Sequence, residues 1–131
     1  MFREDNPYER YRQTQIQTAS PLDLIIMMYD GAIRFINQAK KALAEKKFAP
    51  ANNALQRAQD IIDELNINLN PEAGEIAANL RNLYLFINQR LIEANVKKNG
   101  EILDEALKLL TTLRSSWVEL QAANKPAAVQ K

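Results

Sequence analysis

The chain of 131 residues contains neither cysteine nor histidine. Without cysteine there is no disulfide framework, no thiolate nucleophile and no Cys-based metal site. Without histidine the commonest general base is missing, and the di-iron sites of helical bundles are excluded because they use Glu-x-x-His pairs. The three glycines, Gly31, Gly74 and Gly100, stand too far apart to form a phosphate-binding loop. We therefore expect no enzymatic activity, no cofactor and no metal.

Charge of one sign and long apolar runs are also scarce. The formal net charge is +1 with both signs mixed along the chain, which provides no basic stripe for nucleic acid. Residues 1–15 are too polar for a signal peptide, and no apolar run is long enough for membrane insertion. The expected location is the cytoplasm.

Hydrophobic residues make up 47% of the chain, enough for one domain with a packed core. Residues 1–19 lack sustained periodicity and are expected to form an N-terminal arm, partly ordered or with a short helix. Residues 121–131 are small and polar, and are expected to form a disordered tail. Between them, residues 20–120 carry four segments with helical spacing of apolar residues.

The first helix is expected to begin at Ser20, because Ser20, Pro21 and Asp23 together form a capping signal. Unlike an ordinary amphipathic helix, it is apolar on every side over Leu24–Tyr29. Its main stripe is Ile25, Tyr29, Ala32, Ile36, Ala39 and Leu43, and a second stripe is Leu22, Ile26 and Ile33. Gly31 in the middle indicates a close approach of another element.

Three further helices follow. The second is expected from about Phe48 to Leu65, the third after Asn70-Pro71, and the fourth from about Glu101 to Leu120. Short connections make sequential helices antiparallel neighbours, so the predicted fold is all-α, an antiparallel up-down-up-down four-helix bundle with a mobile N-terminal arm.

A bundle needs one apolar stripe per helix, and this chain has more. The arm or a neighbouring helix could cover the excess as internal core. The surplus face could instead meet a second copy of the chain, or form a groove for a foreign amphipathic helix. Met27 and Met28 suit an adaptable surface and a core equally well. Periodicity alone leaves these three alternatives open.

The order of the motifs resembles one known family. Residues 6–43, NPYERYRQTQIQTASPLDLIIMMYDGAIRFINQAKKAL, are similar to the opening of the flagellar secretion chaperone FliS family. Matching segments follow in order: RAQDIIDEL (57–65), GEIAANLRNLY (74–84), RLIEAN (90–95) and LLTTLRSSW (109–117). The resemblance covers about residues 6–120. Met28 where the family usually has Leu, and Ala73 where it often has a second Gly, are mild departures.

The resemblance implies an export chaperone and not an enzyme. It would bind the disordered C-terminal region of flagellin, prevent premature polymerisation and keep the subunit competent for flagellar type III export. The loaded chaperone would then be recognised by the flagellar export gate. The alternative is a self-associating structural or adaptor bundle, and a homodimer is left open. A segment that folds on binding can wrap a large surface, which suits outer apolar faces.

Candidate contact residues are the apolar positions that lie off the main stripes. For flagellin binding these are Ile16, Leu22, Ile26, Ile33, Leu85, Ile92, Ile102 and Leu109, and for anchoring the arm or a partner Tyr8 and Tyr11. Other residues fall in the family motifs but are expected to be structural. Tyr29, Tyr84 and Trp117 are interpreted as core, and Asn95 and Arg114 as residues that make either capping or core-edge hydrogen bonds.

Overall fold

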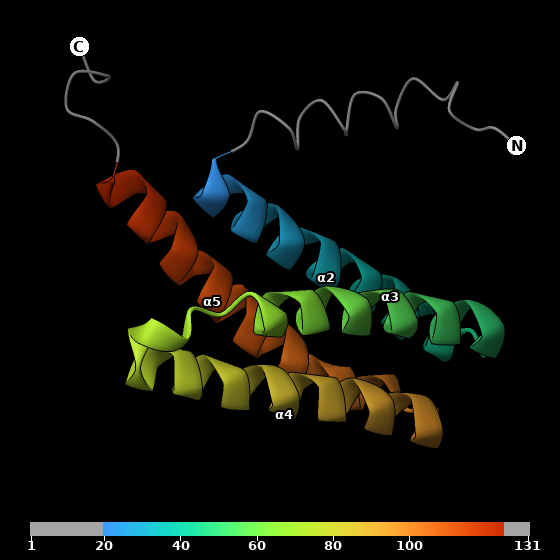
Figure 1. The fold of residues 1–131 in the computed structure, drawn as a ribbon. Coiled ribbons are helices and arrows are strands. Elements are labelled where there is room, and N and C mark those ends of the chain that lie inside the picture. The colour runs from blue at the N-terminus through green and yellow to red at the C-terminus, as the bar shows by residue number, and fades with distance from the viewer. Residues whose placement is uncertain (1–19, 125–131) are drawn as a thin grey trace, which may run out of the picture.

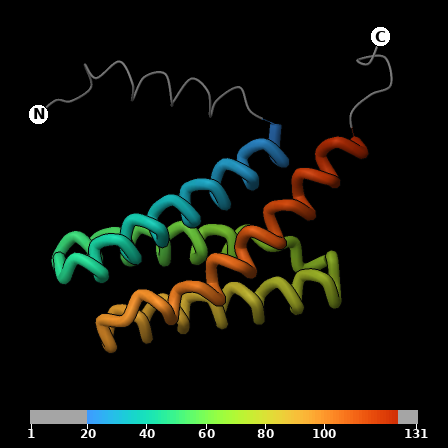
Figure 2. Tube along the Cα trace, turned by 180° about the vertical axis from the view of Figure 1, so that it is seen from behind, coloured from blue at the N-terminus to red at the C-terminus, as the bar shows by residue number. Residues whose placement is uncertain are grey.

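The computed structural model describes residues 20–124, which form four long α-helices and two short 3₁₀ helices. The α-helices are α2 (Pro21–Ala44), α3 (Phe48–Ile67), α4 (Glu75–Lys97) and α5 (Leu103–Ala123), and the 3₁₀ helices are η2 (Pro71–Ala73) and η3 (Gly100–Ile102). Each α-helix runs antiparallel to the one before it, and α5 returns to lie against α2 (Figures 1 and 2). The predicted all-α, up-down-up-down bundle is confirmed.

Helix α2 begins where its sequence predicts. The backbone N–H of Asp23 donates to the Ser20 hydroxyl at 3.1 Å, and the backbone N–H of Ser20 donates to the Asp23 carboxylate at 3.3 Å. Pro21 occupies the first helical position, where a missing N–H costs nothing. This reciprocal pair satisfies two backbone donors that would otherwise lack partners.

Other helix ends differ from the predictions. Asn70 does cap a helix, accepting from the Glu72 N–H at 3.0 Å, but that helix is only the 3₁₀ turn η2. Gly74, with φ of 68°, interrupts the chain there, and α4 starts at Glu75. Likewise α5 begins after η3, and it continues through Ala123, three residues into the predicted tail. Helix α3 extends two residues past Leu65.

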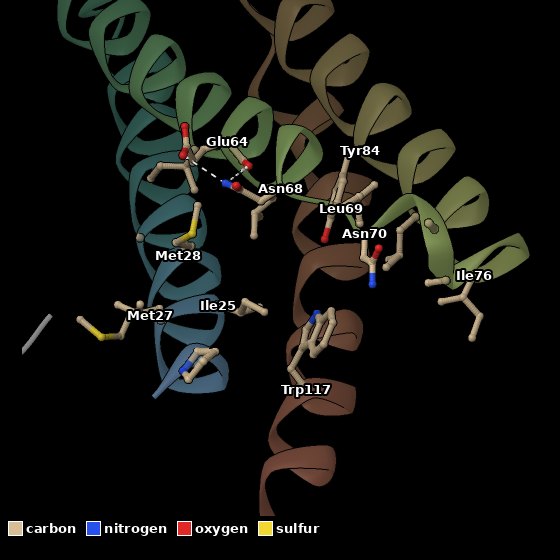
Figure 3. A pocket seen from close by; sticks show the side chains of 18 of the residues that line it. Ile25, Met27, Met28, Glu64, Asn68, Leu69, Asn70, Ile76, Tyr84 and Trp117 are labelled. Carbon is tan, nitrogen blue, oxygen red and sulfur yellow. Dashed lines mark hydrogen bonds between the residues drawn. The ribbon is translucent and has the colours of Figure 1, made fainter. Parts of the chain in front are cut away.

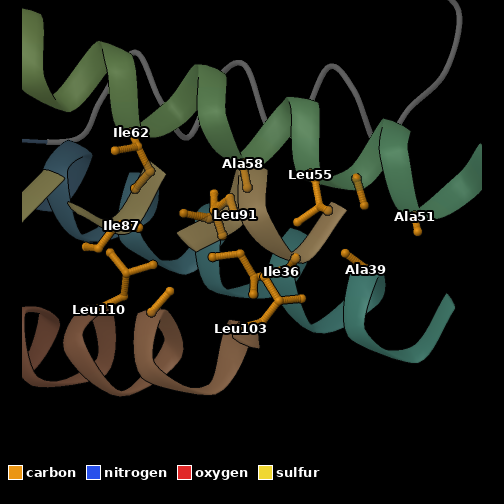
Figure 4. Packing of buried hydrophobic residues seen from close by; sticks show 14 of the residues in the cluster. Ile36, Ala39, Ala51, Leu55, Ala58, Ile62, Ile87, Leu91, Leu103 and Leu110 are labelled. Carbon is orange, nitrogen blue, oxygen red and sulfur yellow. The ribbon is translucent and has the colours of Figure 1, made fainter. Parts of the chain in front are cut away.

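The buried core lies between the four helices and, among the described residues, the only polar groups of its fully buried side chains are the hydroxyls of Tyr29 and Tyr84. Large side chains such as Leu55 and Leu91 alternate with alanines that let helices approach closely (Figure 4). The alanines with no exposed surface are Ala32, Ala39, Ala51, Ala58, Ala94 and Ala106. Tyr29 and Tyr84 belong to this core, as predicted.

Polar contacts at the edge of the core join neighbouring helices. The Asn95 side-chain amide donates to Asn52 Oδ1 at 2.8 Å, joining α4 to α3. Arg114 of α5 forms an ion pair with Asp30 of α2. The prediction that Asn95 and Arg114 make core-edge hydrogen bonds is confirmed.

Gly31 of α2 lies where the neighbouring helix α3 comes close, since a Cβ at this position would meet Ile61 Cδ1 of α3 at 3.3 Å.

Candidate functional site: an apolar groove at one end of the bundle

A groove with a volume of about 1100 Å³ opens at the end of the bundle where α2 begins and α3 ends (Figure 3). Its walls come from the first half of α2, the second half of α3, the α3–α4 connection and the start of α4, with Trp117 contributed by α5. The apolar lining comprises Leu24, Ile25, Met27, Met28, Phe35, Ile61, Leu65, Leu69, Ile76 and Leu80 with several smaller residues. Figure 3 shows Ile25 of α2 and Trp117 of α5 on opposite sides of the opening.

The groove explains much of the unbroken apolar run of α2. Four of its residues, Leu24, Ile25, Met27 and Met28, line the groove, whereas Ile26 and Tyr29 are buried. Trp117 is only partly buried although it packs against the core. Helix α2 is therefore apolar on several sides because one side meets the core and another faces the groove. Methionine side chains suit such a surface because they adapt their shape to an occupant.

The inner end of the groove rests on a buried pair of tyrosines. Tyr29 and Tyr84 are 0% and 1% exposed, and their hydroxyl oxygens share a hydrogen bond 2.6 Å long that joins α2 to α4. Burial raises the pKa of both phenols above the usual value for tyrosine. At Tyr29, the hydrogen bond with Tyr84 and the neighbouring Trp117 oppose the rise in pKa, whereas contact with Tyr29 adds to the rise in pKa at Tyr84. Both phenols therefore stay neutral and structural at physiological pH.

Three charged side chains lie among the lining residues: Arg34, Arg57 and Glu64. The guanidinium carbons of Arg34 and Arg57 lie 5.4 Å and 5.7 Å from the centre of the Phe35 ring, so both stack on one aromatic side chain. Glu64 lies farther along α3 and accepts a hydrogen bond from Asn68 at 3.1 Å. The groove is thus mostly apolar, with charges confined to its rim.

Within residues 20–124, none of the predicted contact residues lines this groove. Leu22 and Ile33 are half-buried, Ile26 is 8% exposed, and Ile102 and Leu109 pack against the core. In contrast, Leu85 and Ile92 are 55% and 50% exposed and lie two turns apart on α4. The described candidates are therefore spread over α2, α4, η3 and α5, and none of them lies in the groove lining. Tyr8, Tyr11 and Ile16 lie outside the described residues.

Positions off the main apolar stripes do not identify most of the groove, because residues on the core-facing stripes line it. Ile25 lies on the main stripe of α2, and Ile76 and Leu80 continue the stripe of α4 that holds Tyr84, Ile87 and Leu91, yet these three residues line the groove. Nearer the middle of the bundle the same stripes are covered by the facing helices. The unbroken run Leu24–Tyr29 was the one local signal that pointed to this end of the bundle.

Within residues 20–124, no group of three or more acidic side chains lies close enough together to bind a metal ion. No helix in the described part of the chain is long and apolar enough to cross a membrane. The groove has the lining of a surface that binds another apolar segment, because its few polar groups lie at the rim. Fold and site together describe an all-α bundle with an apolar groove, the kind of surface on which an amphipathic helix can lay its apolar face.

Comparisons with known proteins define the family. A family model described as "Flagellar protein FliS" matches residues 4–124. The flagellar secretion chaperone FliS of Bacillus subtilis is 36% identical over 112 residues, covering 86% of this chain and 84% of the relative. The corresponding chaperone of Salmonella typhimurium is 33% identical over 110 residues, covering 82% of each chain. The chain belongs to the FliS family of flagellar secretion chaperones and is an export chaperone, not an enzyme.

A solved structure supports the fold independently. A crystal structure of a bacterial flagellar chaperone superposes with a TM-score of 0.75, covering 89% of this chain and 96% of its own. Its sequence is only 22% identical, so this likeness concerns the arrangement of the helices.

Proposed function

We propose that the groove binds a helix from the disordered C-terminal region of flagellin in the cytoplasm. Covering that segment prevents premature polymerisation and keeps the subunit competent for flagellar type III export, and the loaded chaperone is recognised by the export gate. The single observation that carries this proposal is the apolar groove of about 1100 Å³ in a chain of the FliS family. An amphipathic helix can bury its apolar face there without any catalytic group.

The dimensions of the groove support this occupant. Its α2 wall extends from Pro21 to Phe35, a rise of about 21 Å at 1.5 Å per residue. That length accommodates three to four helical turns, which present anchors at spacings of three and four residues. A segment that is disordered when free pays an ordering cost on binding, so a large apolar contact area is needed to offset it.

Leu85 and Ile92 support a wider contact surface for the same client. Both side chains are about half exposed on the outer side of α4, away from the groove lining. We propose that a second part of the client packs there after wrapping around the bundle. The other predicted contacts, Leu22, Ile26, Ile33, Ile102 and Leu109, offer less surface in this structure and stay predictions, as do Tyr8, Tyr11 and Ile16.

Calorimetric titration with a flagellin C-terminal peptide tests the proposal, with the same peptide carrying Ser at its apolar anchors as the comparison. We expect one-to-one binding with a negative heat-capacity change that is lost with the Ser peptide. Trp117, the one tryptophan in the chain, lines the groove, so its fluorescence should change on binding.

A matched pair of variants locates the binding surface. Ile76 lines the groove and is 67% exposed, whereas Ile67 is 75% exposed and does not line it. Ile76→Ser should weaken binding about ten- to a hundredfold, because burying an isoleucine contributes about 1.5–3 kcal/mol, and Ile67→Ser should leave binding unchanged. Equal effects of the two substitutions on binding would show that the groove is not the binding surface.

Failure of the folded protein to bind the peptide would reject the flagellin proposal. Sedimentation would then examine the alternative, a self-associating bundle or homodimer that buries the groove against a second copy.

A further inference from the structure

The charges at the rim of the groove are unevenly distributed. Arg34 of α2 and Arg57 of α3 lie at the same end, since both stack on Phe35. Glu64, the third charged lining residue, follows Arg57 by seven residues, or about 10 Å along α3. One end of the groove is therefore basic, and the charge becomes negative towards the α3–α4 connection.

The two arginines are held in place without an acidic partner among the described residues. Neither takes part in a salt bridge within residues 20–124. A terminal nitrogen of Arg34 also lies 3.9 Å from the position a Cβ would take on Gly31, so this guanidinium folds back along α2 beside the groove. Stacking on Phe35 restricts both side chains, which lowers the entropy lost when they bind an anionic group.

Glu64 has no cationic partner among the described residues. Its hydrogen-bonding partner is the neutral side-chain amide of Asn68, which also donates to the Glu64 backbone carbonyl at 2.8 Å (Figure 3). Because an amide does not neutralise a carboxylate, this part of the rim favours a positive group.

The charges at the two ends of the groove would favour one direction of a bound helix. An α-helix carries partial positive charge at its N-terminus and partial negative charge at its C-terminus. All four helices contribute to the groove, and because they alternate in direction their macrodipoles largely cancel, so the formal charges of the rim decide the preferred direction.

We propose that the groove binds its client helix in one direction. The C-terminal end, with its unpaired carbonyls, lies at Arg34 and Arg57, and the N-terminal end points towards Glu64 and Asn68. The bound helix thus runs parallel to α2 and antiparallel to α3. This inference rests on the proposed function and adds the orientation of the client and the role of the two arginines in selecting it.

Paramagnetic broadening in NMR spectra tests the direction with the unmodified chaperone. Two versions of the flagellin C-terminal peptide carry a nitroxide label, one at each end of the segment that binds the groove. The C-terminal label should broaden the amide signals of residues 34–35 and 57–58, and the N-terminal label those of residues 68–70. The reversed pattern, or equal broadening from both labels, would overturn the orientation while leaving the proposed function intact. Absence of peptide binding would reject both.

Charge reversal tests the arginines directly. Arg34→Glu combined with Arg57→Glu should weaken peptide binding at least tenfold at low salt, with a smaller loss at high salt because ions screen exposed charges. The control combines Arg81→Glu with Lys108→Glu, two exposed residues outside the groove, and makes the same change in net charge. Equal affinities of the two double variants would overturn the role of the arginines.

Discussion

The two ends of this bundle are built from the same four helices but differ in how completely they close. Away from the groove, Leu55, Leu91 and Leu103 have no exposed surface, and alanines let the helices meet closely (Figure 4). At the other end, Ile25, Leu80 and Trp117 are only partly buried and border the groove. The comparison teaches that one apolar stripe can fill a closed core along part of a helix and border an open groove along the rest.

The largest expected effect is on the free energy of unfolding, which substitutions at the two ends should change by different amounts. Leu91→Ala at the closed end should lower the free energy of unfolding by about 3 kcal/mol, because it leaves a cavity in a packed core. Ile76→Ala in the groove should change it by less than about 0.5 kcal/mol, since Ile76 is already exposed to water. Urea denaturation measures both variants. Similar losses would show that the groove end supports the fold as much as the closed end.

Alkaline pH should lower the stability of the protein through the tyrosine pair, which lies at the boundary between the two ends. Both pKa values are raised in the folded protein, so the stabilisation is fully present below the unfolded pKa of about 10. Above it the unfolded state loses protons first, and stability falls by up to about 1.4 kcal/mol per pH unit for each tyrosine. Denaturation between pH 8 and 11 measures this slope. The Tyr29→Phe/Tyr84→Phe variant should lose most of the excess slope, and an unchanged slope would contradict the assignment.

Removing one hydroxyl of the pair has a smaller expected effect. Tyr84→Phe should destabilise the protein by about 1–2 kcal/mol, because it breaks the 2.6 Å hydrogen bond and removes a partner of the buried Tyr29 hydroxyl. The double Phe variant should lose less than the sum of the two single variants, since no phenol is then left without its partner. Thermal unfolding of the four proteins completes the double-mutant cycle, and strict additivity would argue against a coupled pair.

The smallest expected effect concerns the ion pair between α2 and α5. Arg114→Gln should lower the free energy of unfolding by less than about 1 kcal/mol, because Arg114 and Asp30 are 38% and 45% exposed and water screens their attraction. In 1 M salt the difference from the wild type should largely disappear. Denaturation at two salt concentrations measures it, and a loss above 2 kcal/mol would show that this contact holds the two helices together.

Local signals predicted the helices well and their ends less well. The Ser20–Asp23 capping box was readable because all its atoms belong to four consecutive residues. Asn70 and Pro71 gave an equally clear signal, yet it marked η2, because the left-handed conformation of Gly74 interrupts the chain before α4. Capping depends on a few neighbouring residues, whereas the length of a helix also depends on what it packs against.

By itself the sequence determined the all-α class, the order of four helices, the structural roles of Tyr29 and Tyr84, and the family resemblance that the comparisons confirmed. Each follows from spacing within a helix or from the order of motifs along the chain. Only the tertiary structure decided that Ile25, Leu80 and Trp117 border a groove, that Ile26 is buried, and that Arg34 and Arg57 meet at Phe35. Periodicity reports which side of a helix is apolar, but the distance to the facing helix decides whether that side is filled or left open.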